Sequence, residues 1–220
     1  VVRPGALSET LITRFQNERQ TLAKLSHPNI ARLYDGGKAE NGSPYIVMEY
    51  IDGSPITVWA DENNLSKNER LTLFQIICKA IGYAHQNLII HRDITPSNIL
   101  VDKMGVVRII DFGIAKPFGA ESAGAAVGQP PLGLSFTPGF AAPERNHVSE
   151  ANTLTDIYSL GKLLSVLLQS LSDDQELKAI IDKATAENPN DRYEMVSNLE
   201  DEINRYRDGF PVNAIADTTA

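Results

Sequence analysis

The feature that most constrains the fold is residues 157–171, a stretch that is apolar on nearly all sides. A helix of this kind is buried, because it offers no polar face to water. Two amphipathic helices are predicted to follow it, with apolar positions Leu177, Ile180, Ile181 and Ala184 in the first and Met195, Leu199, Ile203 and Tyr206 in the second. The sequence therefore predicts a helical unit built around a central helix that starts at Asp156.

The first 50 residues have a different pattern. Ser8 can cap a helix that ends at His27-Pro28, with apolar positions at helical spacing: Leu11, Phe15, Leu22 and Leu25. Residues 30–34 and 45–50 are rich in Ile, Val, Leu and Tyr and predict two strands. The connection between them is expected at Gly36-Gly37 and Asn41-Gly42, as a hairpin.

A capping-box pair, Ser66 and Glu69, predicts the start of another helix. Its apolar side would consist of Leu73, Phe74, Ile77, Cys78, Ile81 and Ala84. Cys78 is the only cysteine, which excludes a disulfide or a multi-cysteine metal site within the chain and predicts a packing role. Residues 117–143 show no sustained period and predict a long loop, a kind of segment that is often functional.

Composition narrows the class of partner. The formal net charge of -8, with no clustered Lys and Arg, argues against a nucleic-acid partner. No apolar run reaches the roughly 20 residues that span a bilayer, so we expect no membrane segment here and a cytoplasmic location. A membrane anchor outside these residues remains open.

Two motifs carry the candidate chemistry: HRDITPSN at residues 91–98 and DFG at residues 111–113. Strand-like runs at 99–101 and 106–110 separate them. Phosphoryl transfer requires a carboxylate near the acceptor hydroxyl, and an Asp and an Asn that hold Mg²⁺ against the phosphates. Asp93, Asp111 and Asn98 supply that set. The alternative, in which these are ordinary turn residues, would leave the further matches below as accidents.

Together with five other segments, these motifs resemble the eukaryotic-type (Hanks-type) serine/threonine protein kinases, in a bacterial-like form. The five segments are FQNE at 15–18, HPNI at 27–30, YIVMEYI at 45–51, FTPGFAAPE at 136–144 and DIYSLG at 156–161. In that family they correspond to the regulatory helix and following strand, the hinge, the substrate-receiving loop and the central helix.

The resemblance implies an α+β, protein-kinase-like fold. Residues 1–51 would form a truncated N-terminal lobe, a helix plus residual antiparallel strands. Residues 52–209 would form a mainly α-helical C-terminal lobe, and residues 210–220 a linker or tail.

The same resemblance implies a serine/threonine kinase that transfers the ATP γ-phosphate to protein substrates with Mg²⁺. Asp93 would accept the hydroxyl proton, Asn98 and Asp111 would hold the metal, and Thr137 would shape the acceptor site beside Asp93. The implied nucleotide contacts are the ion-pairing Glu18, the gatekeeper Met48, the backbones of Glu49 and Ile51 facing adenine, Leu100 under it, and Asp111.

Supporting roles also follow from the resemblance. Asp156 would hold the catalytic-loop backbone through hydrogen bonds, and Arg192 would pair with Glu144. Four side chains would stack into an internal hydrophobic spine: Leu22, Leu33, His91 and Phe112.

Three departures favour the alternative of a pseudokinase or scaffold that uses the fold as a protein-interaction module. The Gly-rich loop and the strand lysine that partners Glu18 are not among these 220 residues. Thr95 stands where a lysine usually meets the transferred phosphate. The central helix and the next, expected from Asp173, leave little room for the family's docking helix.

The long loop also offers candidate sites of self-phosphorylation. Ser135 is the preferred acceptor, with Ser122 and Thr137 as others, and Arg92 is the residue that would pair with an added phosphate.

Overall fold

The computed structural model describes residues 22–40, 44–112, 139–146, 152–169 and 174–217. Its strands are β1 (Leu33–Lys38), β2 (Pro44–Met48), β3 (Gly53–Pro55), β4 (Ile99–Asp102) and β5 (Val107–Ile109). Its α-helices are α2 (Ile56–Glu62), α3 (Lys67–Gln86), α4 (Thr153–Leu168), α5 (Gln175–Ala184), α6 (Val196–Arg207) and α7 (Asn213–Asp217). Three 3₁₀ turns complete it: η1 (Pro96–Asn98), η2 (Pro143–Asn146) and η3 (Pro189–Asp191).

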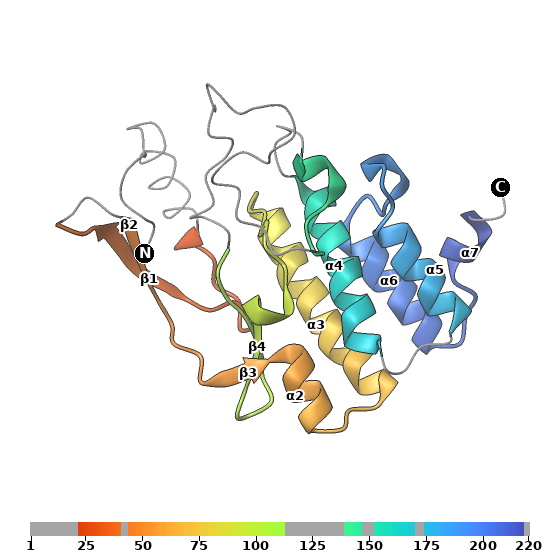
Figure 1. Ribbon diagram of the computed structural model, residues 1–220, viewed down its shortest axis with the longest axis horizontal. Helices are drawn as coiled ribbons and strands as arrows, with labels where there is room; N and C mark the ends of the chain where they lie inside the picture. The colour runs from red at the N-terminus through yellow and green to blue at the C-terminus, as the bar shows by residue number, and fades with distance from the viewer. Residues whose placement is uncertain (1–21, 41–43, 113–138, 147–151, 170–173, 218–220) are drawn as a thin grey trace.

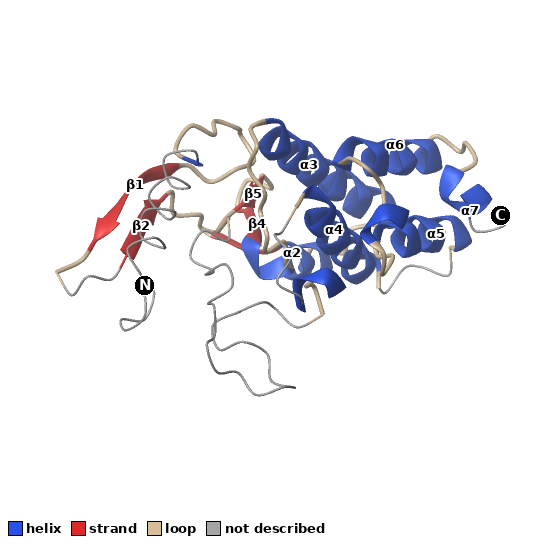
Figure 2. Ribbon diagram, turned by 90° about the horizontal axis from the view of Figure 1, so that it is seen from above, coloured by secondary structure: helices blue, strands red, loops and turns tan. Residues whose placement is uncertain are grey.

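The strand pair β1–β2 lies at one end of the molecule and the helices α3 to α7 at the other, as Figure 1 shows. The antiparallel sheet β3–β4–β5 lies between them. The same order is visible from above in Figure 2. This is the predicted α+β arrangement, with few strands in the N-terminal part and a mainly helical C-terminal part. None of the helices described is long and apolar enough to cross a membrane.

The predicted hairpin at residues 30–50 exists, but its details differ. Gly36 and Gly37 lie inside β1, where they pair with Ile46 and Tyr45, so the prediction that they form the connection is wrong. A Cβ on Gly37 would lie only 3.0 Å from the Tyr45 hydroxyl, so glycine here makes room for the tyrosine ring. The expected turn at Asn41-Gly42 lies outside the described residues.

Ile30 and Ala31, which the sequence predicted as part of the first strand, do not belong to β1. Together with Asn29 they lie along β5. Ile30 forms an isolated parallel bridge with Ile109. Ile109 N–H donates to Asn29 O at 2.8 Å, and Ala31 N–H donates to Ile109 O at 2.9 Å. The Asn29 side chain also donates to Val107 O at 2.9 Å. These bonds join the N-terminal part of the chain to the central sheet.

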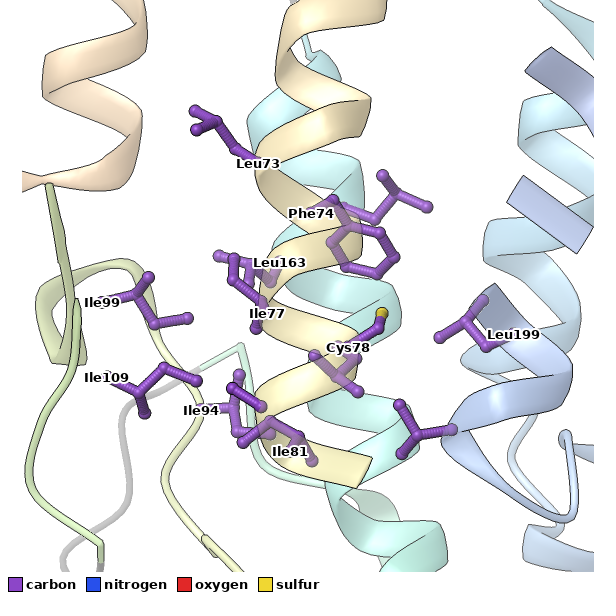
Figure 3. Packing of buried hydrophobic residues seen from close by; sticks show 14 of the residues in the cluster. Leu73, Phe74, Ile77, Cys78, Ile81, Ile94, Ile99, Ile109, Leu163 and Leu199 are labelled. Carbon is purple, nitrogen blue, oxygen red and sulfur yellow. The ribbon is translucent and has the colours of Figure 1, made fainter. Parts of the chain in front are cut away.

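The core is built around α3, as Figure 3 shows. Phe74, Ile77, Cys78 and Ile81 on this helix are all at most 1% exposed. They meet side chains of α4, α6, β4 and β5: Leu163, Leu199, Ile99 and Ile109. The predicted packing role of Cys78 is confirmed, and burial raises the pKa of its thiol well above the ordinary value.

The predicted central helix is α4, which starts three residues earlier than expected. Asn152 caps it, since its side chain accepts hydrogen bonds from the N–H groups of Leu154 and Thr155. Only residues 169–174 separate α4 from α5, which confirms that little room is left for a further helix there.

The structure contains elements that the sequence did not predict. β3 and α2 follow the hinge segment, with Ile56 and Ala60 fully buried. Val212 and Ala214, in the segment expected as a linker or tail, are buried in the core of the helical part. The buried Glu202 carboxylate accepts the Ala214 N–H at 3.0 Å, so the start of α7 is tied to α6.

Candidate active site

The HRDITPSN segment forms a turn whose backbone is hydrogen-bonded to a side chain of α4. Asp156 is fully buried, and its carboxylate accepts the N–H groups of His91 and Arg92, both at 2.8 Å. Arg92 has a left-handed φ of 69°, which costs a non-glycine residue about 1–2 kcal/mol. The two hydrogen bonds hold this conformation, so the predicted supporting role of Asp156 is confirmed.

His91 is fully buried and stacks on Phe112, with ring centroids 4.5 Å apart. Its Nε2 lies 3.2 Å from Ile110 O, and its Nδ1 accepts the Asp93 N–H at 3.2 Å. A carbonyl cannot donate, so the ring proton is on Nε2 and the imidazole is neutral. Burial lowers the pKa of His91 in agreement with this. The ring therefore packs, as predicted, and also links the backbones of the two motifs.

Asn98 adjoins Asp93 directly. Its Nδ2 donates to the Asp93 carbonyl oxygen and to Asp93 Oδ2, both at 2.9 Å. The opposite amide orientation would place an oxygen against two acceptors, so this one is fixed. Both amide protons are thus engaged, and Asn98 Oδ1 is the atom left to act as a ligand.

The DFG motif is attached to the same turn. Ile110 N–H donates to Asn98 O at 2.9 Å. Asp111 is the next residue in the chain, so this bond places it beside the catalytic loop. Asp111 also has a left-handed φ, 54°, and residues held in such conformations cluster at functional sites. The structure thus bonds Asn98 directly to Asp93, and it links Asp111 to Asn98 through the backbone of the neighbouring Ile110.

A pocket lies between the N-terminal part and the segment from the end of β5 to Phe112. It is lined by Leu22, Leu25, Ile30, Ala31, Leu33, Met48, Ile109, Asp111 and Phe112. Three of the four predicted spine residues are in this lining, and the fourth, His91, stacks on Phe112. The expected gatekeeper Met48 is there as well.

The hinge segment follows Met48. Glu49 N–H donates to Arg32 O at 2.8 Å, so the backbone group that Glu49 can offer a ligand is its carbonyl. Ile51 is half-buried, and Leu100 is half-buried on β4.

Several predicted site residues lie outside the part of the chain that the structure describes. They are Glu18, Thr137, Ser122 and Ser135.

Thr95 differs in character from the lysine that the resemblance would place there. It is 1% exposed, and its Oγ1 lies 2.9 Å from Ser97 Oγ. The position therefore contributes a short, buried hydroxyl instead of a cation.

The end of the predicted substrate-receiving loop is anchored to α4. Ser159 Oγ donates to Phe140 O at 2.9 Å. Glu144 forms two hydrogen bonds with Arg192, both at 2.8 Å, as predicted. Burial alone would raise the pKa of Glu144, but the hydrogen bond from Arg192 outweighs it and the pKa is lowered.

His85 is a neighbour of this network that the sequence did not indicate. Its Nε2 lies 2.8 Å from Asp156 Oδ2, across 71 positions of sequence. A lone histidine at the end of an amphipathic helix offers no signal for such a contact.

Comparison with known proteins identifies relatives over nearly the whole chain. A model of the protein kinase domain matches residues 5–205. Serine/threonine-protein kinase PknB of Mycobacterium tuberculosis is 32% identical over 233 residues, covering 91% of this chain and 37% of that protein. Serine/threonine-protein kinase PrkC of Bacillus subtilis is 34% identical over 231 residues, covering 92% of this chain and 35% of that protein. The chain thus spans little more than a third of the length of these relatives.

Proposed function

Because this chain belongs to the protein kinase domain family, we propose that the protein transfers the γ-phosphate of ATP to serine or threonine hydroxyls of protein substrates. The observation that carries this proposal is the Asn98 amide, which ties the Asp93 carboxylate to the turn that also presents Asp111. Phosphoryl transfer depends on such positioning more than on covalent chemistry.

Asp93 is the proposed base. Its backbone N–H is bonded to His91 Nδ1 and its Oδ2 accepts from Asn98, so the carboxylate is held at a defined place in the turn. We propose that it accepts the proton of the substrate hydroxyl. Thr137 is proposed to shape the acceptor site beside it.

Members of this family use ATP and a divalent metal ion, and we propose Mg²⁺. The donor set fits, since Mg²⁺ prefers oxygen ligands and is usually held by one or two protein groups plus phosphates. Asn98 Oδ1 and the Asp111 carboxylate are such groups. Within the described residues no cluster of three His, Cys, Asp or Glu side chains forms an all-protein metal cage. The ion would neutralise charge on the phosphates.

We further propose that adenine lies between the two predicted lobes, residues 1–51 and 52–209. The Glu49 carbonyl is suited to face adenine because its N–H is already bonded to Arg32 O. Ile51, Leu100 and Met48 are proposed to complete that side, and Glu18 to support the phosphate side. The cytoplasm, where ATP is available, is the proposed location.

A pseudokinase or scaffold is the second candidate, and Thr95 is the observation that favours it. Without a lysine here, one charge-assisted hydrogen bond to the phosphate is missing, worth about 1.5–3 kcal/mol. At about 1.4 kcal/mol per tenfold, that slows transfer without preventing it. The intact Asp93, Asn98 and Asp111 therefore favour the enzyme.

The test is transfer of labelled γ-phosphate by the full-length gene product, to itself and to a generic protein acceptor, with Mg²⁺. Asp93→Asn should abolish transfer, whereas Asp201→Asn, an exposed carboxylate on α6, should leave it unchanged. Mass spectrometry would show whether Ser135 or Ser122 becomes phosphorylated. A folded wild-type protein that transfers nothing would favour the scaffold.

A further inference from the structure

We propose that Arg108 is a positioning residue for nucleotide binding, acting on the hinge through the Glu49 carboxylate. The proposal rests on the function proposed above, in which the Glu49 carbonyl faces adenine. Arg108 is the middle residue of β5, between the buried Val107 and Ile109. Because side chains alternate along a strand, Arg108 points to the face of β5 opposite the core.

The Arg108 guanidinium is held in place by two other segments. Its Nη1 donates to Pro28 O at 2.7 Å, across 80 positions of sequence. Its Nε lies 3.9 Å from Asp102 Oδ2, an ion pair within the β4–β5 hairpin. The Asp102 carboxylate is itself fixed, because its Oδ1 accepts the N–H groups of Met104 and Val106, both at 2.9 Å. The cation therefore has a defined place on this face of β5.

Glu49 is the hinge residue that meets this cation. Its Oε1 lies 4.0 Å from Arg108 Nη1. Its Oε2 accepts the Arg32 N–H at 3.1 Å, and its own N–H donates to Arg32 O at 2.8 Å. The carboxylate and the backbone of Glu49 are thus both bonded to the same residue, so the place of the side chain and the place of the backbone are coupled.

The charges explain why Arg108 matters for this arrangement. The side chains of Arg108 and Glu49 are only 25% and 28% exposed. A carboxylate that is partly removed from water needs a compensating cation, and Arg108 supplies it. Without Arg108, we expect the Glu49 carboxylate to turn toward solvent and release the Arg32 N–H. The hinge backbone would then lose its defined position.

The consequence for the nucleotide follows from the place of the hinge. Met48, the residue before Glu49, lines the pocket. The proposed adenine contacts, the Glu49 carbonyl and the Ile51 backbone, lie on the same segment. A displaced hinge would weaken binding in the ground state and in the transition state alike, because adenine takes no part in the transfer. Such a change raises KM and leaves kcat unchanged.

Two alternatives predict different results. If Arg108 only ties residue 28 to β5, its removal should lower the melting temperature and leave the affinity for nucleotide unchanged. If Arg108 instead restrains the hinge against a movement that transfer requires, its removal should raise kcat.

Calorimetric titration of the full-length protein with ADP and Mg²⁺ separates these roles. Arg108→Met removes the charge and keeps an apolar stem, and we expect it to raise the Kd for ADP about three- to tenfold, the effect of losing one polar contact. Arg108→Lys retains a cation and should recover most of the wild-type affinity. Lys103→Met removes an exposed cation from the turn of the same hairpin and is the control, with the wild-type Kd expected.

A double-mutant cycle tests whether Glu49 carries the effect. Glu49→Gln keeps an acceptor for the Arg32 N–H but has no charge to compensate. Arg108→Met should therefore weaken ADP binding much less in the Glu49→Gln protein than in the wild type. In transfer assays, the KM for ATP of Arg108→Met should rise by the same factor as the Kd for ADP, with kcat unchanged.

Amide hydrogen exchange of the hinge gives a readout without nucleotide. The Glu49 N–H should exchange about three- to tenfold faster in Arg108→Met, because its bond to Arg32 O then opens more often. Lys103→Met should exchange at the wild-type rate. If Arg108→Met does not fold, Arg108→Gln, which keeps a donor and lacks the charge, replaces it.

The outcomes are distinct. A folded Arg108→Met protein with wild-type ADP affinity and wild-type exchange would overturn the proposal. A raised kcat would do so too, as would an equal loss of affinity with and without the Glu49 charge. If the wild type neither binds nucleotide nor transfers phosphate, the proposed kinase function fails. The exchange rate of the Glu49 N–H then still decides whether Arg108 holds the hinge.

Discussion

Arg192 and Glu144, 48 positions apart, meet in a two-pronged ion pair with both Nη atoms 2.8 Å from the carboxylate oxygens. The Arg192 side chain is fully buried and also donates to the carbonyls of Ala186 and Leu154, at 2.8 and 3.0 Å. One guanidinium therefore joins η2, the start of α4 and the segment after α5.

We expect removal of either partner to damage folding before chemistry. Arg192→Ala or Glu144→Gln should lower the free energy of unfolding by about 3–5 kcal/mol, because the other charge stays buried and unpaired. Urea denaturation measures this. Lys103→Met, at an exposed ion pair with Asp52, is the control and should cause no measurable change. Wild-type stability in Arg192→Ala would contradict the prediction.

Gly161 permits the close approach of α4 and α5. A Cβ at this position would lie 2.7 Å from Thr185 Cγ2 and 2.8 Å from Ala184 Cβ. We expect Gly161→Ala to destabilise the protein by about 1–3 kcal/mol through overpacking, despite the higher helix propensity of alanine. Gly82→Ala on α3 is the matched control, since nothing lies within 4 Å of its Cβ position. Thermal denaturation should show a gain for Gly82→Ala, and a gain for both variants would refute the packing argument.

Leu88 occupies a position that suits glycine. Its φ is 61° and its side chain is 92% exposed. The Leu88 N–H donates to His85 O and the Ile89 N–H donates to Ala84 O, which is the hydrogen-bond pattern of a Schellman cap. Leu88→Gly should stabilise the protein by about 0.5–1 kcal/mol, because the left-handed conformation no longer opposes a Cβ. Leu88→Ala retains the Cβ and should bring no such gain. Melting temperatures of the three proteins decide the matter.

Because of His91, we expect the folded protein to lose stability below neutral pH. The pKa of His91 is lowered in the folded protein, so below about pH 6.5 the unfolded chain binds a proton that the folded protein does not. The free energy of unfolding should therefore fall by up to about 1.4 kcal/mol per pH unit for this one group. Urea denaturation at pH 7.5 and 5.5 tests this. His91→Phe, less stable overall, should show a flatter pH dependence, and an equal slope in both proteins would exclude His91 as the source.

The helices were predictable because their signals are local. The Ser66–Glu69 capping box is present, and the apolar positions from Leu73 to Ala84 that predicted α3 are buried. The Asp93, Asn98 and Asp111 cluster could also be anticipated, since motif spacing carries it. Their roles in transfer remain predictions.

The features that the sequence did not predict correctly depend on partners far away in the sequence. Gly37 lies within a strand because Tyr45 covers it from across the hairpin. The start of α7 is held by Glu202 on another helix, whose carboxylate accepts the Ala214 N–H and the side-chain amide of Asn213. The His85 contact with Asp156 likewise joins two helices, and neither residue's neighbours in sequence indicate it.

The bonds between residues 29–31 and β5 bear on any attempt to dissect the molecule. A recombinant fragment starting at residue 52, where the expected lobe boundary lies, would strip Asn29 and Ala31 from Ile109 and expose both of its backbone groups to solvent. The helical part should therefore not be separated from the rest of the chain at the hinge. A fragment meant to fold alone should begin upstream of residue 26, so that it keeps residues 29–31 bonded to β5.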